Sequence, residues 1–131
     1  IQWDIKNLNN IFQDISVDCV MQSFVLHEFI EDKSLEWILR WISEHIYPKY
    51  ILMREFCPPK KIYSIKDIVN DSFYFGHNLL HVLSKQETFI VEEWNIEMKK
   101  YNYKNIHTHH RFPYAKNESL YPIICYEKNS K

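Results

Sequence analysis

Glycine is almost absent from this sequence, with Gly76 the single one among 131 residues. Loops that cradle phosphate groups need several glycines, because their backbone adopts positive φ or approaches the ligand closely. A dinucleotide-binding loop, a P-loop and the nucleophile elbow of a serine hydrolase are therefore excluded. Tight two-residue hairpin turns also favour glycine, so the composition argues against a β-sandwich or barrel and favours helices.

Cysteines and long apolar runs are scarce as well. The three cysteines form no C-x-x-C pair, and an odd number in a chain of this size is not a disulfide framework. We therefore expect a reducing, intracellular compartment, the cytoplasm or the nucleus. The longest stretch without a charged residue, 72–84, has 13 residues, whereas about 20 are needed to span a bilayer. No membrane partner is expected.

Apolar residues recur at helical spacing along most of the chain. The expected helices span about 17–31, 35–46, 65–69, 72–84 and 88–101. The run 50–56 is ambiguous between a helix and a buried strand, and we favour a helix. The periodicity is lost after Asn102, and 121–126 favours one short extended segment. The sequence thus predicts a mainly α fold: a compact bundle of five or six helices with an irregular C-terminal segment that adds at most one short strand.

The chain begins with Ile1 rather than Met, and its length suits one core. Residues 1–131 are therefore expected to form a single helical domain excised from a larger protein. Charge is uneven along it, with a net of −4 over residues 1–59 and +3 over residues 60–131. An anionic partner is expected to meet the C-terminal half, and the oligomeric state stays open.

Two tryptophans lie one turn apart on the expected helix 35–46. Trp37 and Trp41, with His45 continuing their line, occupy one side of that helix. This side is either a second core contact or an exposed aromatic surface. Because tryptophans are enriched at interaction hot spots, Trp37, Trp41 and His45 are the candidate partner-binding residues, with another protein as the expected partner.

A basic and aromatic segment, residues 99–116, contains five cations and no carboxylate. Cations neutralise phosphates and aromatic rings stack on unpaired bases, so the segment is the candidate site for single-stranded RNA or DNA. A solvated loop whose rings tuck into the core is the alternative. The candidate residues are Lys99, Lys100, Tyr101, Tyr103, Lys104, Arg111, Phe112, Tyr114 and Lys116.

Histidines suggest a third hypothesis. His77 and His81 are four apart on an expected helix, and His107 and His109 lie in an expected loop. Together these four could hold zinc, although no Glu occupies the position used by zinc proteases and no cysteine pair supports a structural site. The same imidazoles, with Lys104, could cleave a phosphodiester by acid–base catalysis.

No convincing catalytic set or cofactor loop emerges from these patterns. His27, Glu28, Glu31 and Asp32 form an acidic patch that is most simply a solvated helix face. The leading hypothesis is therefore a non-catalytic protein–protein interaction or scaffold module of a larger protein or assembly, with no catalytic residue and no cofactor, zinc being the one exception considered. Nucleic-acid binding and a phosphodiesterase are the alternatives.

Overall fold

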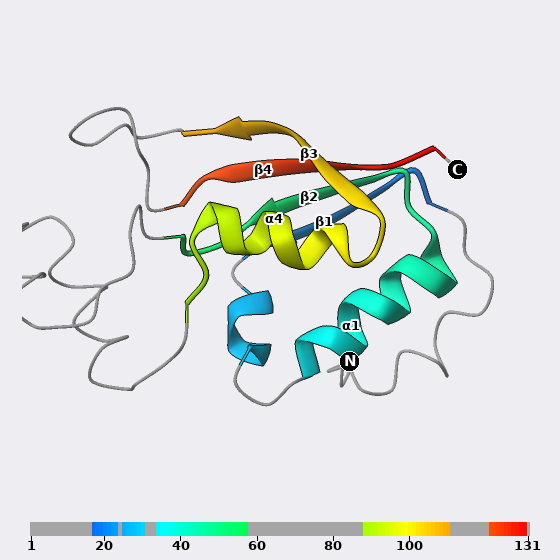
Figure 1. Ribbon diagram of the computed structural model, residues 1–131, viewed down its shortest axis with the longest axis horizontal. Coiled ribbons are helices and arrows are strands. Elements are labelled where there is room, and N and C mark those ends of the chain that lie inside the picture. The colour runs from blue at the N-terminus through cyan, green and yellow to red at the C-terminus, as the bar shows by residue number, and fades with distance from the viewer. Residues whose placement is uncertain (1–16, 24, 31–33, 58–87, 111–120, 131) are drawn as a thin grey trace, which may run out of the picture.

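The computed structural model describes residues 17–23, 25–30, 34–57, 88–110 and 121–130 (Figure 1). Their main feature is a four-stranded mixed sheet accompanied by two α-helices and two short helices. In chain order the elements are β1 (Cys19–Ser23), η2 (Leu26–Phe29), α1 (Ser34–Trp41), η3 (Ile42–Ile46), β2 (Tyr50–Arg54), α4 (Val91–Lys99), β3 (Tyr103–His109) and β4 (Ile123–Lys128).

The strands follow the order β1-β2-β4-β3 across the sheet. β1 and β2 are parallel, with Cys19 opposite Tyr50, so the chain between them crosses over the sheet through η2, α1 and η3. β4 runs antiparallel to both β2 and β3. A register shift between Asn105 and His107 interrupts the β3–β4 pairing. The parallel pair is a βαβ unit, the kind of unit from which α/β enzymes are built.

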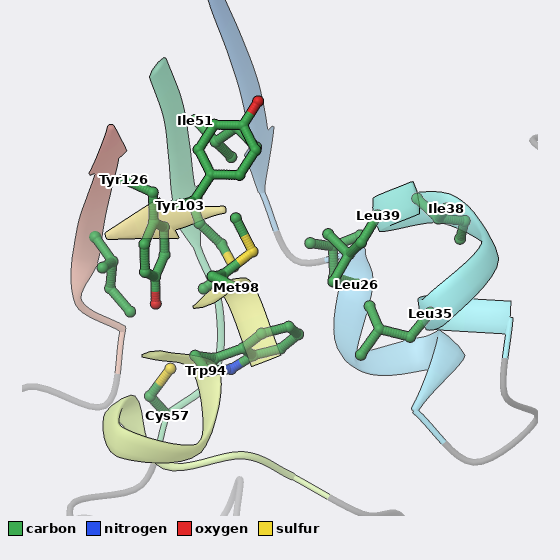
Figure 2. Close-up of a cluster of buried hydrophobic side chains, with 12 residues drawn as sticks. Leu26, Leu35, Ile38, Leu39, Ile51, Cys57, Trp94, Met98, Tyr103 and Tyr126 are labelled. Carbon is green, nitrogen blue, oxygen red and sulfur yellow. The ribbon is translucent and has the colours of Figure 1, made fainter. Parts of the chain in front are cut away.

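One hydrophobic core joins the sheet to both α-helices. Trp94 and Met98 of α4 lie against the sheet, and side chains of α1 and η2 form the other end of the same cluster (Figure 2). Alternate residues of the strands face this core, because side chains of a strand point in turn to opposite faces. The strand residues in the core are Ile51, Met53, Tyr103, Ile124 and Tyr126, each at most 2% exposed.

The predicted mainly α bundle is wrong, because the described residues contain a four-stranded sheet. The argument from scarce glycine fails since none of these strands is joined to the next by a tight hairpin. Residues 24–49, 55–102 and 110–122 connect them instead. Two left-handed positions are taken by Tyr47 (φ 56°) and Asn102 (φ 68°), so the chain turns there without glycine.

Individual elements divide between confirmed and wrong predictions. Helical structure over 35–46 and 88–101 is confirmed by α1 with η3 and by α4, and the extended segment near 121–126 is β4. The favoured helix over 50–56 is wrong, since it contains β2, and the expected helix 17–31 contains β1 and η2. The stretch after Asn102, taken as loop, contains β3. The expected helices 65–69 and 72–84 lie outside the described residues.

No helix among the described residues is long and apolar enough to cross a bilayer.

Candidate active site

A buried histidine and a buried glutamate meet where the two parallel strands end. β1 ends at Ser23 and β2 at Arg54, and both ends lie at the same edge of the sheet because the strands are parallel. His27 follows in η2, and Glu55 is the first residue after β2. In open α/β sheets, ligands bind beyond the carboxyl ends of the strands, so this pair stands where an active site is expected.

The side chain of Glu55 is fully buried, and both of its carboxylate oxygens have hydrogen-bond partners. Its Oε1 accepts hydrogen bonds from the backbone N–H groups of Val25 (3.0 Å) and Leu26 (2.8 Å), and its Oε2 lies 2.6 Å from Nδ1 of His27. The side chain has an exposed fraction of 0%. A buried carboxylate is tolerated only when it is paired and hydrogen-bonded. These three contacts meet that condition and fix the turn that carries His27.

His27 is buried too, with an exposed fraction of 9%. Because Nδ1 is engaged by Glu55, the second ring nitrogen, Nε2, faces the exposed carboxylate of Glu28, 3.1 Å from its Oε1. The hydrogen bond with Glu55 raises the pKa of His27 above its ordinary value of 6.5 against the opposing effect of burial, and the negative charges of Glu55 and Glu28 raise it further.

The pair has the geometry of an oriented general base. A carboxylate that accepts from Nδ1–H fixes the ring and its tautomer and stabilises the imidazolium, leaving Nε2 to take a proton from a substrate. A base works best when its pKa is close to the working pH. Because the pKa of His27 is raised above its ordinary value of 6.5, Nε2 becomes available only as the pH rises through that higher pKa.

Replacement of Glu55 by Gln is expected to lower the pKa of His27, because the largest cause of its elevation is removed. A histidine with a raised pKa stabilises the fold most below its ordinary pKa of 6.5, and this contribution is lost as the pH rises through the folded-state value. NMR titration of the His27 ring, with urea unfolding on both sides of neutrality, measures both effects. An unchanged titration in the variant would contradict the assignment.

Sequence patterns missed this site. The interpretation of His27 and Glu28 as part of a solvated helix face is wrong for His27, which is buried beneath its neighbours. The missing signal was the pair of strands: once Cys19–Ser23 and Tyr50–Arg54 are recognised as parallel, the polar residues just after each end are expected to meet. Glu55 lies 28 residues from His27, so no local motif joins the two.

The aromatic residues predicted to bind a partner differ in how far they are exposed to solvent. Trp41 is 3% exposed and its ring stacks on that of His45, with centroids 5.6 Å apart. Trp37 has an exposed fraction of 36%. The structure thus places one tryptophan in the core and one at the surface, and the partner-binding role stays a prediction.

The residues of the basic and aromatic segment also differ in their surroundings. Tyr103 is buried and donates a hydrogen bond to the carbonyl oxygen of Pro48 (2.7 Å), and burial raises its pKa to about 12. Lys100 pairs with Glu97, and Lys104 lies 3.5 Å from a carboxylate oxygen of Glu127. Lys99 ends α4, and Tyr101 is half-buried. The remaining candidates, Arg111, Phe112, Tyr114 and Lys116, lie outside the described residues.

Two of the four candidate zinc ligands are described. His107 and His109 lie on β3 with their rings stacked, 6.3 Å between centroids. Within the described ranges, no group of three or more His, Cys, Asp or Glu side chains is placed to hold a metal ion. His77 and His81 lie outside those ranges, so the four-histidine site stays a prediction.

A polar cavity of about 530 Å³ opens at the other end of the sheet. Its lining includes Tyr47, which precedes β2, and Lys128, which ends β4. The amino end of β2 is therefore near this cavity, whereas His27 and Glu55 lie beyond its carboxyl end. The cavity is separate from the histidine–glutamate pair.

No family model and no curated protein matches this chain. Its structure is similar to that of LepI in complex with SAM (11% identity, TM-score 0.59, covering 88% of this chain and 27% of that one). It is also similar to the mitomycin 7-O-methyltransferase MmcR (16%, 0.58, 91% and 32%) and to LaPhzM (16%, 0.60, 98% and 34%). The chain thus spans about a third of these proteins, and the likeness concerns the fold.

These comparisons correct the predicted function. The sequence predicts an all-helical, non-catalytic scaffold module that needs no cofactor. That prediction is overturned, because the fold is shared with an O-methyltransferase and with a protein described in complex with SAM. His27 and Glu55 meet just beyond the carboxyl ends of the parallel strands, which is where open α/β folds commonly bind their ligands.

Proposed function

We propose that the protein is an enzyme of the methyltransferase type, which transfers a methyl group to a hydroxyl oxygen, and that this chain supplies its general base. The observation that carries the proposal is the 2.6 Å contact between Nδ1 of His27 and the fully buried Glu55. The fold shared with an O-methyltransferase supports the choice of reaction.

Nε2 of His27 takes the proton of the acceptor hydroxyl as its oxygen becomes the nucleophile. The imidazolium that forms is stabilised by Glu55, which keeps its negative charge and its hydrogen bonds to the backbone of Val25 and Leu26. Before the next reaction, the proton passes from Nε2 to solvent and the base is restored.

The described residues do not by themselves form a site for S-adenosylmethionine. No glycine occurs among them, since Gly76 lies outside the described ranges, and the polar cavity is at the other end of the sheet. Glycine is the residue that most readily lets backbone approach a nucleotide-like cofactor closely. Only the acceptor side of the reaction therefore follows from the described residues.

Binding of S-adenosylhomocysteine to the intact protein, measured by calorimetry, and transfer of labelled methyl from S-adenosylmethionine to a panel of small phenols and alcohols test the proposal. We expect binding together with a labelled ether whose formation accelerates as the pH rises through the pKa of His27. An intact protein that binds neither compound and transfers no label would contradict it.

We further propose a reducing, intracellular compartment for the protein. Cys19, Cys57 and Cys125 are all free thiols. Burial raises the pKa of the Cys57 thiol, so this cysteine is an unreactive core residue rather than a nucleophile. A thiol count of three in freshly purified protein, measured after unfolding in denaturant without reductant so that the buried Cys57 reacts too, is the expected result.

A further inference from the structure

Glu28 contacts the catalytic face of His27. Its Oε1 lies 3.1 Å from Nε2, and its side chain is 61% exposed, against 11% for His27. Adjacent residues of a helix normally point in different directions. The contact therefore depends on Glu28 turning back over its neighbour's ring, and a side-chain rotation alone would undo it.

The two carboxylates beside His27 are held very differently. Glu55 is fixed by three contacts and has no exposed surface, whereas Glu28 faces solvent. Carboxylates accept hydrogen bonds, so a carboxylate at each ring nitrogen requires a proton on each. When both ring nitrogens are protonated, His27 is an imidazolium between the fixed carboxylate of Glu55 and the movable carboxylate of Glu28. Of the charged groups that contact His27 in the described residues, these are the two that act on its titration.

We infer that Glu28 is a displaceable cap on His27, which occupies the place that the acceptor oxygen takes during the reaction and carries the Nε2 proton out to solvent when it turns away. Its Oε1 stands at hydrogen-bond distance from the atom that must receive the acceptor's proton, so cap and acceptor exclude one another. This inference rests on the proposed function, because it presumes that Nε2 is the working base.

The proton balance follows directly. Glu28 accepts the Nε2 proton, rotates outward and releases it to water, which leaves a neutral ring with its remaining proton on Nδ1, donated to Glu55. The acceptor hydroxyl then enters and gives its proton to Nε2. One proton leaves before the reaction and one enters during it, so His27 ends in the state in which it began. Glu28 is a positioning residue, since it acts through His27.

Replacing Glu28 by Gln tests the cap without any catalysis. The side chain keeps its size and loses its charge, so the proton affinity of His27 is expected to fall by about two- to fivefold, the range for an exposed ion pair. The His27 ring is followed by ¹⁵N NMR between about pH 5 and pH 9, with its signals assigned from a His27→Gln sample. The difference is expected to shrink in about 0.5 M sodium chloride, and Glu28→Asp, which keeps the charge, is expected to restore part of the affinity.

The matched control is Glu36→Gln, an exposed carboxylate paired with Arg40 on α1 rather than with His27. A His27 titration that is the same in E28Q, E36Q and the unaltered protein would overturn the cap.

A second readout is kinetic, in the methyl-transfer assay. E28Q is expected to lower the KM for the acceptor and to move the acid limb of the pH profile to lower pH by the shift seen in the NMR titration. A KM and an acid limb equal to those of E36Q would overturn the cap while leaving the proposed function intact. Methyl transfer absent from the unaltered protein would contradict the proposed function, whereas the NMR titration would still decide whether Glu28 holds the Nε2 proton.

Discussion

Replacement of His27 by Asn is expected to lower methyl-transfer turnover by about 10²–10⁴-fold, the usual contribution of a positioned general base. Asn can still donate to Glu55, so the buried carboxylate keeps a partner and the local fold is retained, but it cannot take a proton from the acceptor. The rate should also lose its rise with pH, because the group whose titration would produce that rise is gone. Initial rates across the pH range measure both effects.

His45→Asn is the matched control for this experiment. His45 is an exposed histidine of η3, stacked on Trp41 and separate from the carboxyl ends of the strands. Its replacement is expected to leave the turnover and its pH dependence unchanged. Equal turnover in the H27N and H45N proteins, with both folded by circular dichroism, would rule out His27 as the base.

Replacement of Glu55 by Ala is expected to lower the free energy of unfolding by roughly 3–5 kcal/mol. The change leaves the backbone N–H groups of Val25 and Leu26 without their acceptor, and Nδ1 of His27 without the carboxylate it contacts. Each buried polar group left without a partner carries its full desolvation penalty. The truncation also opens a cavity in a position with no exposed surface. Urea denaturation measures the loss.

Two variants separate this effect from a simple loss of charge. Glu55→Gln keeps an acceptor for the backbone donors and fills the same volume, so its loss of stability is expected to be the smaller one. Glu36→Ala removes an exposed carboxylate whose partner is Arg40, and should cost less than about 1 kcal/mol. A Glu55→Ala protein no less stable than Glu36→Ala would mean that the buried contacts do not hold η2 in place.

The described helices could be predicted because their information is local. Leu35, Ile38 and Leu39 fall on one side of α1 and are buried, as helical spacing requires, and Trp94 and Met98 do the same in α4. Strand β2 is harder, because a short apolar run fits either structure and its partner is distant in the chain. Ile51 pairs with Tyr126, which lies far along the sequence.

Glycine content proved a poor guide to fold class for a physical reason. Scarce glycine disfavours tight hairpins, and the described strands are joined by long connections, so the constraint does not apply to this sheet. Where the chain does enter the left-handed region, Tyr47 and Asn102 accept it. Asn is tolerated there because its short polar side chain can bond locally. At Tyr47 the ring lies beneath Nζ of Lys128, 3.3 Å from its centroid.

By itself, the sequence determined the positions of α1 and α4 and the extended segment at β4. It also showed that glycine-rich loops are absent and that the three cysteines form no C-x-x-C pair. These follow from composition and from spacings within one turn or one strand. Only the tertiary structure decided that β1 and β2 pair in parallel and so bring His27 to Glu55. Strand pairing depends on contacts between residues far apart in the chain, and a catalytic pair made by that pairing leaves no local pattern to read.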